Sequence, residues 1–189
     1  MRFTPTALPG VVLVEPDVHR DERGFFVEVF HRTRWAEQGG LDLDFVQDNH
    51  SRSRRGTLRG LHAQIETPQG KLVRCPRGAL FDVAVDVRRD SPTFGRWVGY
   101  ELSEENFRQL WIPPGFLHGF CALSEIAELS YKCTGPYDPA AEITVAWNDP
   151  EIGIAWPVTE PVLSARDAAA PPLAALHARL SCYSGSPAP

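Results

Sequence analysis

Residues 80–87, Leu-Phe-Asp-Val-Ala-Val-Asp-Val, alternate strictly between two kinds of side chain. Successive side chains of a β-strand point to opposite faces, so one face would carry Phe81, Val83, Val85 and Val87, and the other Asp82, Ala84 and Asp86. We therefore predict a strand with one face in an apolar core. The other face would meet either water or a polar pocket.

Shorter runs with strand character flank this stretch, and 17 prolines and 15 glycines supply the turns between them. The predicted strands are residues 11–14, 25–30, 45–51, 71–77, 97–102, 110–112, 127–133 and 143–147. Residues 31–40, which end in Gly39-Gly40, are expected to form a short helix with the glycines as its stop. About ten short strands without regular helical intervals favour an all-β double-sheet barrel or jelly roll.

The 189 residues suit one domain, which we place at residues 1–167, followed by a C-terminal tail of residues 168–189 with a short helix at 173–180. With a net charge of -5, the surface as a whole lacks the positive charge that would attract nucleic acid or an anionic membrane. The sequence has no signal segment and no membrane-spanning run. Four cysteines without a Cys-x-x-Cys pair suggest reduced thiols in a cytoplasm.

Residues 56–64, Gly-Thr-Leu-Arg-Gly-Leu-His-Ala-Gln, and residues 69–71, Gln-Gly-Lys, combine turn glycines, two cations and an imidazole. His62 ionises near neutral pH, whereas Arg59 and Lys71 supply positive charge for a phosphate or a developing oxyanion. We interpret this region as an active-site wall built for proton abstraction from a bound anion. The alternative is a surface strand with a solvated arginine and a stray histidine.

Other polar residues leave both a functional and a structural interpretation open. Asp82 could orient His62, fix a ligand hydroxyl or be an exposed strand residue. Residues 25–30 are expected to be covered on both faces, so Glu28 would pair with a cation or with a ligand, and Arg23 would be its partner or a phosphate contact. Two amides on one strand face could grip a polyhydroxyl ligand or satisfy the backbone; they belong to Gln47 and Asn49.

The run Pro113-x-Gly115-x-x-His118 fits the second half of the cupin pattern and places His118 near the barrel interior. The first half is missing, because a metal-binding cupin has His-x-His and a glutamate, whereas His62 is followed by Ala63-Gln64. We therefore expect neither a catalytic metal nor another cofactor.

Several motifs together resemble the dTDP-4-dehydrorhamnose 3,5-epimerase family, over about residues 3 to 167. In chain order they are residues 59–62 (RGLH), 69–74 (QGKLVR), 81–86 (FDVAVD), 91–95 (SPTFG), 108–113 (RQLWIP), 115–120 (GFLHGF), 131–132 (YK) and 163–167 (LSARD). The resemblance implies a metal-free cupin jelly roll (a double-stranded β-helix), a homodimer with strands contributed across its interface, and a dTDP-4-keto-6-deoxyhexose substrate.

The resemblance also implies roles for individual residues in deoxysugar biosynthesis, for rhamnose or an antibiotic sugar. His62 would be the base, Tyr131 the acid on the opposite face of the sugar, and Asp167 the residue that orients His62, with Asp82 as second choice. Lys71 would meet the enolate oxygen. Arg23 and Arg59 would meet the pyrophosphate, and further contacts to the sugar or nucleotide would come from Phe26, Glu28, Gln47, Asn49, His118 and Tyr137.

Two departures from the family pattern leave the regiochemistry open. Ala63 replaces the usual aromatic residue after the histidine, and Pro136-Tyr137 replaces Tyr-Tyr, so the pocket would be wider or its loop differently set. The expected reaction is epimerisation at carbons 3 and/or 5 next to the ketone. The alternatives are a mono-epimerase acting at carbon 3 or 5 only, and a catalytically silent cupin that binds nucleotide sugars.

Overall fold

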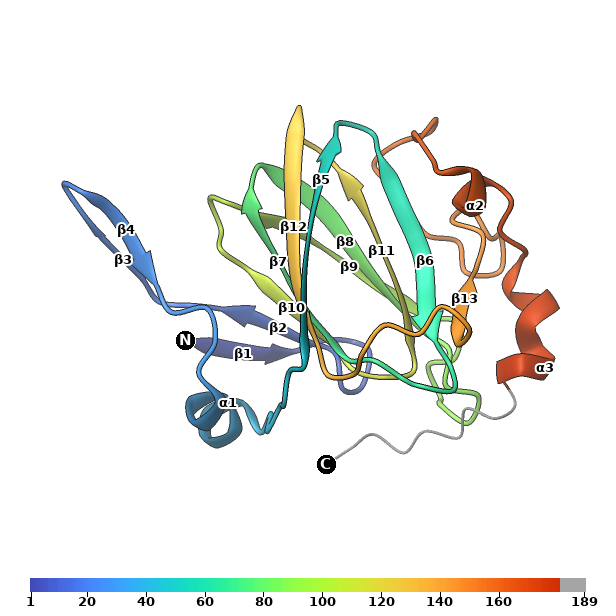
Figure 1. Cartoon of the computed structure of the whole chain (residues 1–189), viewed down its shortest axis with the longest axis horizontal. Helices are drawn as coiled ribbons and strands as arrows, with labels where there is room; N and C mark the ends of the chain where they lie inside the picture. Colours follow the sequence, from blue (N-terminus) through green and yellow to red (C-terminus); the bar gives the residue numbers. More distant parts are fainter. Residues whose placement is uncertain (181–189) are drawn as a thin grey trace.

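The computed structural model describes residues 1–180, in which two antiparallel sheets face each other as a jelly roll (Figure 1). The first sheet has the order β1 (Arg2–Pro5), β2 (Val12–Glu15), β10 (Gln109–Ile112), β7 (Lys71–Arg77), β12 (Ile126–Cys133), β5 (Gln47–Arg54). The second has the order β13 (Glu142–Thr144), β6 (Leu58–Gln64), β11 (Phe116–Ala122), β8 (Ala79–Asp86), β9 (Trp97–Ser103). A separate hairpin joins β3 (Val18–Asp21) to β4 (Gly24–Val27).

The main core lies between the two sheets, where Leu110 and Leu129 of the first meet Leu80 and Phe120 of the second. The predicted strand at residues 80–87 is confirmed as β8. The polar face of β8 is not open to water, however. It points into the barrel interior, where both Asp82 and Asp86 are fully buried. Asp86 is satisfied there by Arg88, whose guanidinium nitrogen lies 2.7 Å from its carboxylate.

The outer face of the six-stranded sheet is covered by helix α1 (Arg32–Gly39), which buries Trp35 against Val14, Leu72 and Trp111. The predicted helical stop is confirmed, because Gly40 caps α1 in the left-handed conformation (φ 67°).

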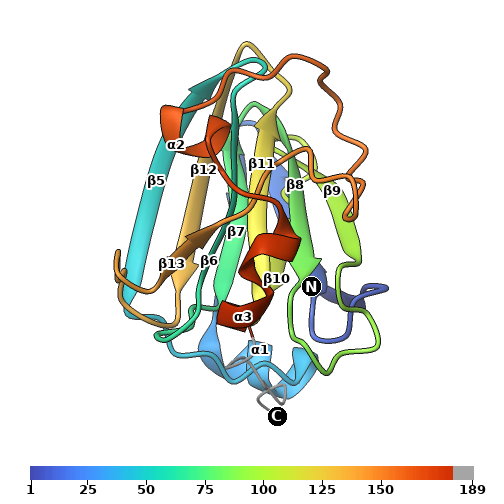
Figure 2. The ribbon, with the colours of Figure 1, turned by 90° about the vertical axis from the view of Figure 1, so that its right-hand side faces the viewer.

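The outer face of the five-stranded sheet is covered by the C-terminal segment, which contains α2 (Ala165–Ala168), the 3-10 helix η1 (Leu173–Leu176) and α3 (His177–Leu180) (Figure 2). Leu173 and Leu180 are buried in the same cluster as Val83 and Val85 of β8. The predicted helical piece at residues 173–180 is therefore confirmed, and it packs on the barrel. The predicted strand at 143–147 ends earlier, at Thr144.

The β3–β4 hairpin projects away from the two sheets (Figure 1). The expectation that residues 25–30 are covered on both faces is wrong within one chain, since Phe25 is 57% and Phe26 is 70% exposed. Arg23 does not pair with Glu28. It binds Asp21, its neighbour in the hairpin turn, at 2.5 Å, and Glu28 binds Arg34 at 2.6 Å.

Candidate active site

His62 stands on β6 directly opposite His118 of β11, at a place where these two strands come unusually close. A side chain at Gly60 would lie only 2.6 Å from the Cα of Gly119, and Gly60 has a φ of 130°, which other residues rarely adopt. The ladder between the strands also shifts register beyond His118. Gly60 and Gly119 therefore permit the close approach of β6 and β11 that positions His62.

A buried carboxylate holds the imidazole of His62. Its Nε2 lies 2.6 Å from Oδ1 of Asp167, and the hydroxyl of Ser164 donates to the other carboxylate oxygen at 2.9 Å. Ser164 also caps α2 by accepting a hydrogen bond from the Asp167 amide at 3.0 Å. Because a carboxylate only accepts, Nε2 carries the proton, and Nδ1 keeps a free lone pair.

Opposing effects act on the Asp167 carboxyl. Burial would raise its pKa, but the hydrogen bonds from His62 and Ser164 and the charges of His62 and Arg166 outweigh burial, so the pKa lies below its ordinary value of 3.8. Asp167 is therefore an anion at neutral pH. It can stabilise the imidazolium that forms when His62 accepts a proton.

A second histidine and carboxylate form a separate pair inside the barrel. Oδ2 of Asp82 lies 2.8 Å from Nε2 of His118, and both side chains are buried. Asp82 therefore orients His118. As the structure stands it is not the partner of His62, and the second choice made from the sequence is corrected in favour of Asp167.

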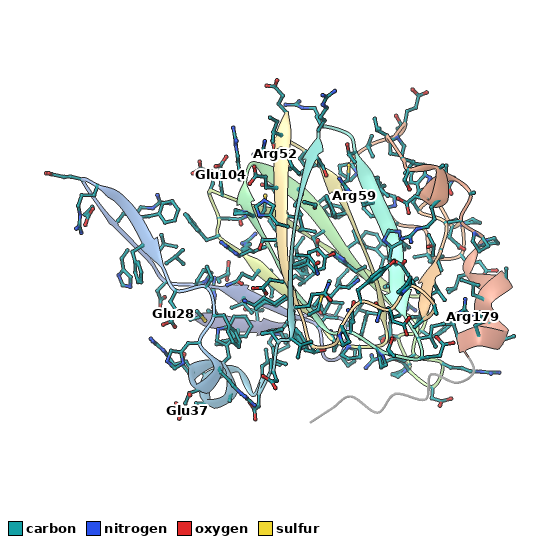
Figure 3. All side chains as sticks on the ribbon, viewed as in Figure 1. Glu28, Glu37, Arg52, Arg59, Glu104 and Arg179 are labelled. Atoms are coloured by element: carbon teal, nitrogen blue, oxygen red, sulfur yellow. The ribbon has the colours of Figure 1, made fainter. Side chains whose placement is uncertain are left out.

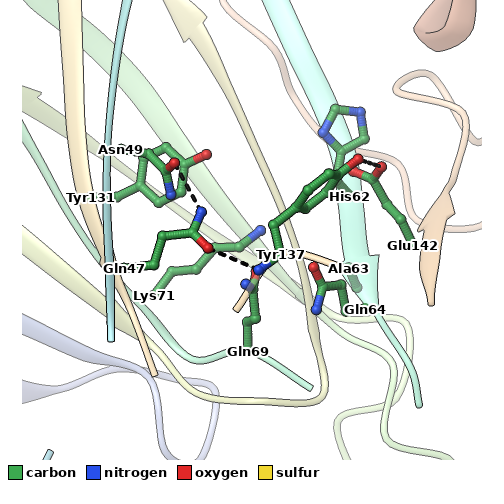
Figure 4. A pocket seen from close by; sticks show the side chains of 10 residues that line it. All are labelled: Gln47, Asn49, His62, Ala63, Gln64, Gln69, Lys71, Tyr131, Tyr137 and Glu142. Atoms are coloured by element: carbon green, nitrogen blue, oxygen red, sulfur yellow. Dashed lines mark hydrogen bonds between the residues drawn. The ribbon is translucent and has the colours of Figure 1, made fainter. Parts of the chain in front are cut away.

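A pocket of about 270 Å³ opens beside His62, between the ends of β5, β6, β7 and β12 (Figure 4). Tyr131 and Lys71 line it together with His62, so the base, the acid and the oxyanion partner expected from the sequence share one cavity. The whole lining comprises Gln47, Asn49, His62, Ala63, Gln64, Gln69, Lys71, Tyr131, Tyr137 and Glu142.

The surroundings shift the pKa values of Lys71 and Tyr131 in opposite directions. Burial lowers the pKa of the Lys71 ammonium, although the nearby negative charges of Glu142 and Asp82 partly oppose this. Burial raises the pKa of Tyr131, and the charge of Glu142 adds to the effect. Tyr131 therefore keeps its proton at neutral pH, as a proton donor must.

Tyr137 lines the pocket together with His62 (Figure 4). Its hydroxyl donates to Glu142 at 2.8 Å, and Glu142 also receives two bonds from Arg166, at 2.5 and 2.9 Å. A guanidinium nitrogen of Arg166 lies 3.1 Å from Nε2 of His62. Burial would raise the pKa of the Glu142 carboxyl, but the hydrogen bonds from Arg166 and Tyr137 outweigh burial and lower it. Glu142 is therefore an anion, and its ion pair with Arg166 holds the cluster together.

Gln47 and Asn49 both line the pocket and are bonded to each other at 3.0 Å. Gln47 also accepts the backbone N–H of Tyr137 at 2.8 Å. The two interpretations of these amides are therefore compatible, because in this structure they satisfy protein groups and also border the cavity.

Arg59 lines a second cavity, of about 370 Å³, which also contains His62, Arg166 and Asp167. The guanidinium is exposed and donates to Ser53 Oγ and to the Arg52 carbonyl, both at 3.2 Å. His62 thus separates the polar pocket from a cavity with two arginines, where an anionic group would be met by positive charge.

The structure does not bring every predicted site residue to this pocket. Arg23, Phe26 and Glu28 belong to the hairpin and its base, and Figure 3 shows Glu28 at the base of the hairpin, away from Arg59 over the central strands. His118 is 7% exposed, is bound to Asp82 and does not line the pocket. Its predicted contact with substrate is therefore not seen in this chain.

Ala63 borders the pocket, and it also packs in the apolar cluster with Leu61, Ile143 and Leu173, on the face that the C-terminal segment covers. The expectation of a wider pocket stays a prediction.

Sequence reasoning missed Glu142 and Arg166, which complete the cluster around Tyr137, whereas Gln64, which lines the pocket, belongs to the predicted wall but received no individual role. The spacing Ser164-x-x-Asp167 is that of a helix cap, and it could have predicted the Ser164 contact. No local pattern marks Glu142, because its partner Arg166 lies 24 residues away.

Within residues 1–180, no three or more His, Cys, Asp or Glu side chains are grouped so that they could hold a metal ion. In the same part of the chain, no helix is long and apolar enough to cross a membrane.

Comparison with known proteins places this geometry in a family. Residues 5–175 match the family model of dTDP-4-dehydrorhamnose 3,5-epimerase. The enzyme of that name from Salmonella typhimurium is 58% identical over 168 residues, which cover 88% of this chain and 92% of the relative. A dTDP-4-dehydrorhamnose 3-epimerase from Streptomyces niveus is 44% identical over 168 residues, or 88% of this chain and 81% of the relative.

Among solved structures, the dTDP-6-deoxy-D-glucose-3,5-epimerase of Legionella pneumophila, in complex with dTDP-4-keto-L-rhamnose, superposes with a TM-score of 0.91. It is 50% identical, and the match covers 95% of this chain and 96% of that one. The chain belongs to the dTDP-4-dehydrorhamnose 3,5-epimerase family.

Proposed function

We propose that the protein epimerises a dTDP-4-keto-6-deoxyhexose at carbons 3 and 5, through an enolate, in deoxysugar biosynthesis. The observation that carries this proposal is the shared pocket of His62, Lys71 and Tyr131, with Asp167 bound to the imidazole. Epimerisation next to a ketone removes a proton from one face and returns one to the other, so it needs two titratable groups.

Nδ1 of His62 takes the proton from the carbon next to the ketone, and the electron pair of the broken C–H bond forms the enolate. The Lys71 ammonium donates a hydrogen bond to the enolate oxygen. One preorganised donor of this kind typically contributes about 2.7 to 4 kcal/mol to transition-state stabilisation. Tyr131 then gives its proton to the opposite face of the same carbon.

Identity to the Salmonella typhimurium 3,5-epimerase (58%) is higher than to the Streptomyces niveus 3-epimerase (44%), which favours reaction at both carbons. The test is deuterium wash-in: in heavy water, the ketosugar should gain deuterium at carbons 3 and 5. Incorporation at one carbon alone would make the protein a mono-epimerase. No incorporation, with dTDP still bound, would identify a silent nucleotide-sugar-binding cupin.

The enzyme works as a homodimer in this proposal, and the hairpin of each copy reaches the pocket of the other. Support comes from the projecting β3–β4 hairpin, the exposure of Phe25 and Phe26, and the distance of Arg23 from the pocket of its own chain. Across the interface, Arg23 would add positive charge for the pyrophosphate, and Phe26 and Glu28 would contact the nucleotide.

We place the enzyme in the cytoplasm. Three of its four cysteines lie in the described part of the chain, and Cys75, Cys121 and Cys133 are free and buried there. Burial raises the pKa of Cys75 to about 11, so its thiol stays protonated and unreactive. Cys182 lies outside the described residues.

A further inference from the structure

The segment that carries Tyr137 is held beside the pocket by amide side chains, of which Gln64 is buried. Gln64, only 6% exposed, donates its Nε2 to the carbonyl of Pro136 at 3.2 Å, and its Oε1 accepts the N–H of Asp138 at 2.9 Å. One side chain thus binds the residue before Tyr137 and the residue after it. The same Nε2 also donates to the Thr67 carbonyl at 2.7 Å.

Neighbouring bonds tie the start of this segment to the strand that carries Lys71. Gln69 donates to the carbonyl of Gly135 at 2.7 Å, and Gly70 and Thr134 exchange two bonds, at 2.8 and 3.0 Å. The Tyr137 side chain itself has few constraints, because it is 52% exposed and its hydroxyl bonds only to the Glu142 cluster. The position of its ring therefore depends on its backbone.

We propose that Gln64 is a positioning residue that holds Tyr137 at the substrate pocket, and so sets the affinity for the dTDP-sugar through Tyr137. The proposal rests on the proposed function, in which Tyr137 contacts the substrate. Gln64 follows the base His62 by two residues on β6, so one rigid strand places both side chains. We call the hydrogen bonds of Gln64 to Pro136 and Asp138 the clasp, because they hold the Tyr137 segment on both sides of Tyr137.

Replacing Gln64 with glutamate tests the clasp, because the side chain keeps its size while an oxygen faces the Thr67 and Pro136 carbonyls in place of the donor. Gln64→Glu should raise KM for the ketosugar by about 10-fold, the equivalent of about 1.4 kcal/mol, and change kcat by less than about 2-fold. Gln38→Glu, on the exposed surface of α1, controls for the added charge.

The decisive comparison repeats Gln64→Glu in a Tyr137→Ala background. If Gln64 acts through Tyr137, adding Gln64→Glu to the Tyr137→Ala variant should raise KM by less than about 2-fold. An equal rise in both backgrounds would overturn the proposal. Should Gln64→Glu fail to fold in a thermal melt, Gln64→Met takes its place in the cycle, because this uncharged side chain of similar length removes both the donated bonds and the bond accepted from Asp138.

A measurement independent of turnover separates this proposal from the proposed function. Hydrogen exchange of the Asp138 amide should accelerate at least 10-fold in Gln64→Met, which removes the acceptor of this N–H, whereas the Val145 amide, bonded to the Leu61 carbonyl at 2.9 Å, should be unchanged. Unchanged exchange at Asp138 would refute the clasp even in an active enzyme. Absence of epimerisation by the wild type would refute the proposed function and leave the exchange result to judge the clasp.

Discussion

Asp167→Asn should abolish most proton exchange, and the matched change Asp82→Asn should not. Each aspartate is buried and bound to one histidine, at 2.6 Å for Asp167 and His62 and at 2.8 Å for Asp82 and His118. Each substitution preserves shape and removes one charge. The comparison therefore asks which histidine performs the chemistry.

The magnitude follows from the hydrogen bond that is lost. A charge-assisted hydrogen bond contributes about 1.5 to 3 kcal/mol, and each 1.36 kcal/mol is a factor of ten, so weaker support of the imidazolium costs about 10- to 150-fold in kcat. The asparagine can also donate its NH2 to Nε2 and move the ring proton to Nδ1, which removes the lone pair. In a serine protease triad the corresponding change costs about 10⁴-fold. We expect a loss between about 10² and 10⁴ for Asp167→Asn, and less than about 10-fold for Asp82→Asn.

The assay is the initial rate of deuterium wash-in at carbons 3 and 5, followed by NMR of the ketosugar in heavy water. Thermal melts and dTDP titrations confirm that both variants fold and bind. The reasoning is refuted if Asp167→Asn exchanges within about 3-fold of the wild-type rate, or if Asp82→Asn loses as much as Asp167→Asn.

Four further predictions use other parts of the site. Tyr131→Phe should incorporate deuterium while the sugar keeps its configuration, because His62 can return the proton to the face it left; epimerisation at near the wild-type rate would exclude Tyr131 as the acid. The alkaline fall of kcat/KM should belong to Lys71, since burial lowers the pKa of its ammonium and raises the pKa of the Tyr131 hydroxyl; Lys71→Arg should move the fall to higher pH, and an unmoved profile would contradict the assignment. Co-expressed His62→Asn and Arg23→Ala chains should recover activity that neither has alone, because one site of each mixed dimer is intact; no recovery would count against the shared hairpin. Turnover should survive exhaustive chelation, because Ala63 and Gln64 follow His62 where a metal-binding cupin has further ligands; loss of turnover that one divalent ion restores would disprove this.

The pH dependence of stability follows from Asp167 as well. Its pKa in the folded chain lies below the ordinary 3.8, so its bonds to His62 and Ser164 stabilise the fold fully only above that value. This contribution is lost as pH falls through the lower folded pKa. The contribution of Glu142 to stability changes with pH in the same direction, because Arg166 and Tyr137 lower the pKa of its carboxyl.

The sequence by itself determined most of the strand pattern, the helix before Gly40 and, in the pocket wall, His62, Lys71 and Tyr131. These depend on short-range rules: alternation in β8, a glycine stop after α1, and the family motifs around His62, Tyr131 and Asp167. Such rules say which face a side chain takes within one strand. They do not say what covers that face.

Tertiary structure alone decided which partners meet. Asp82 and Asp167 were both candidates for His62, and the pairing of β8 with β11 gave Asp82 to His118, while the C-terminal segment brought Asp167 back across 105 residues. It also carried Arg23 and Phe26 out on a hairpin and joined Glu142 to Arg166. The physical reason is that a buried charge is stable only beside a group that pairs with it. Which group lies there depends on how distant strands are arranged in the fold, and no local sequence pattern specifies that arrangement.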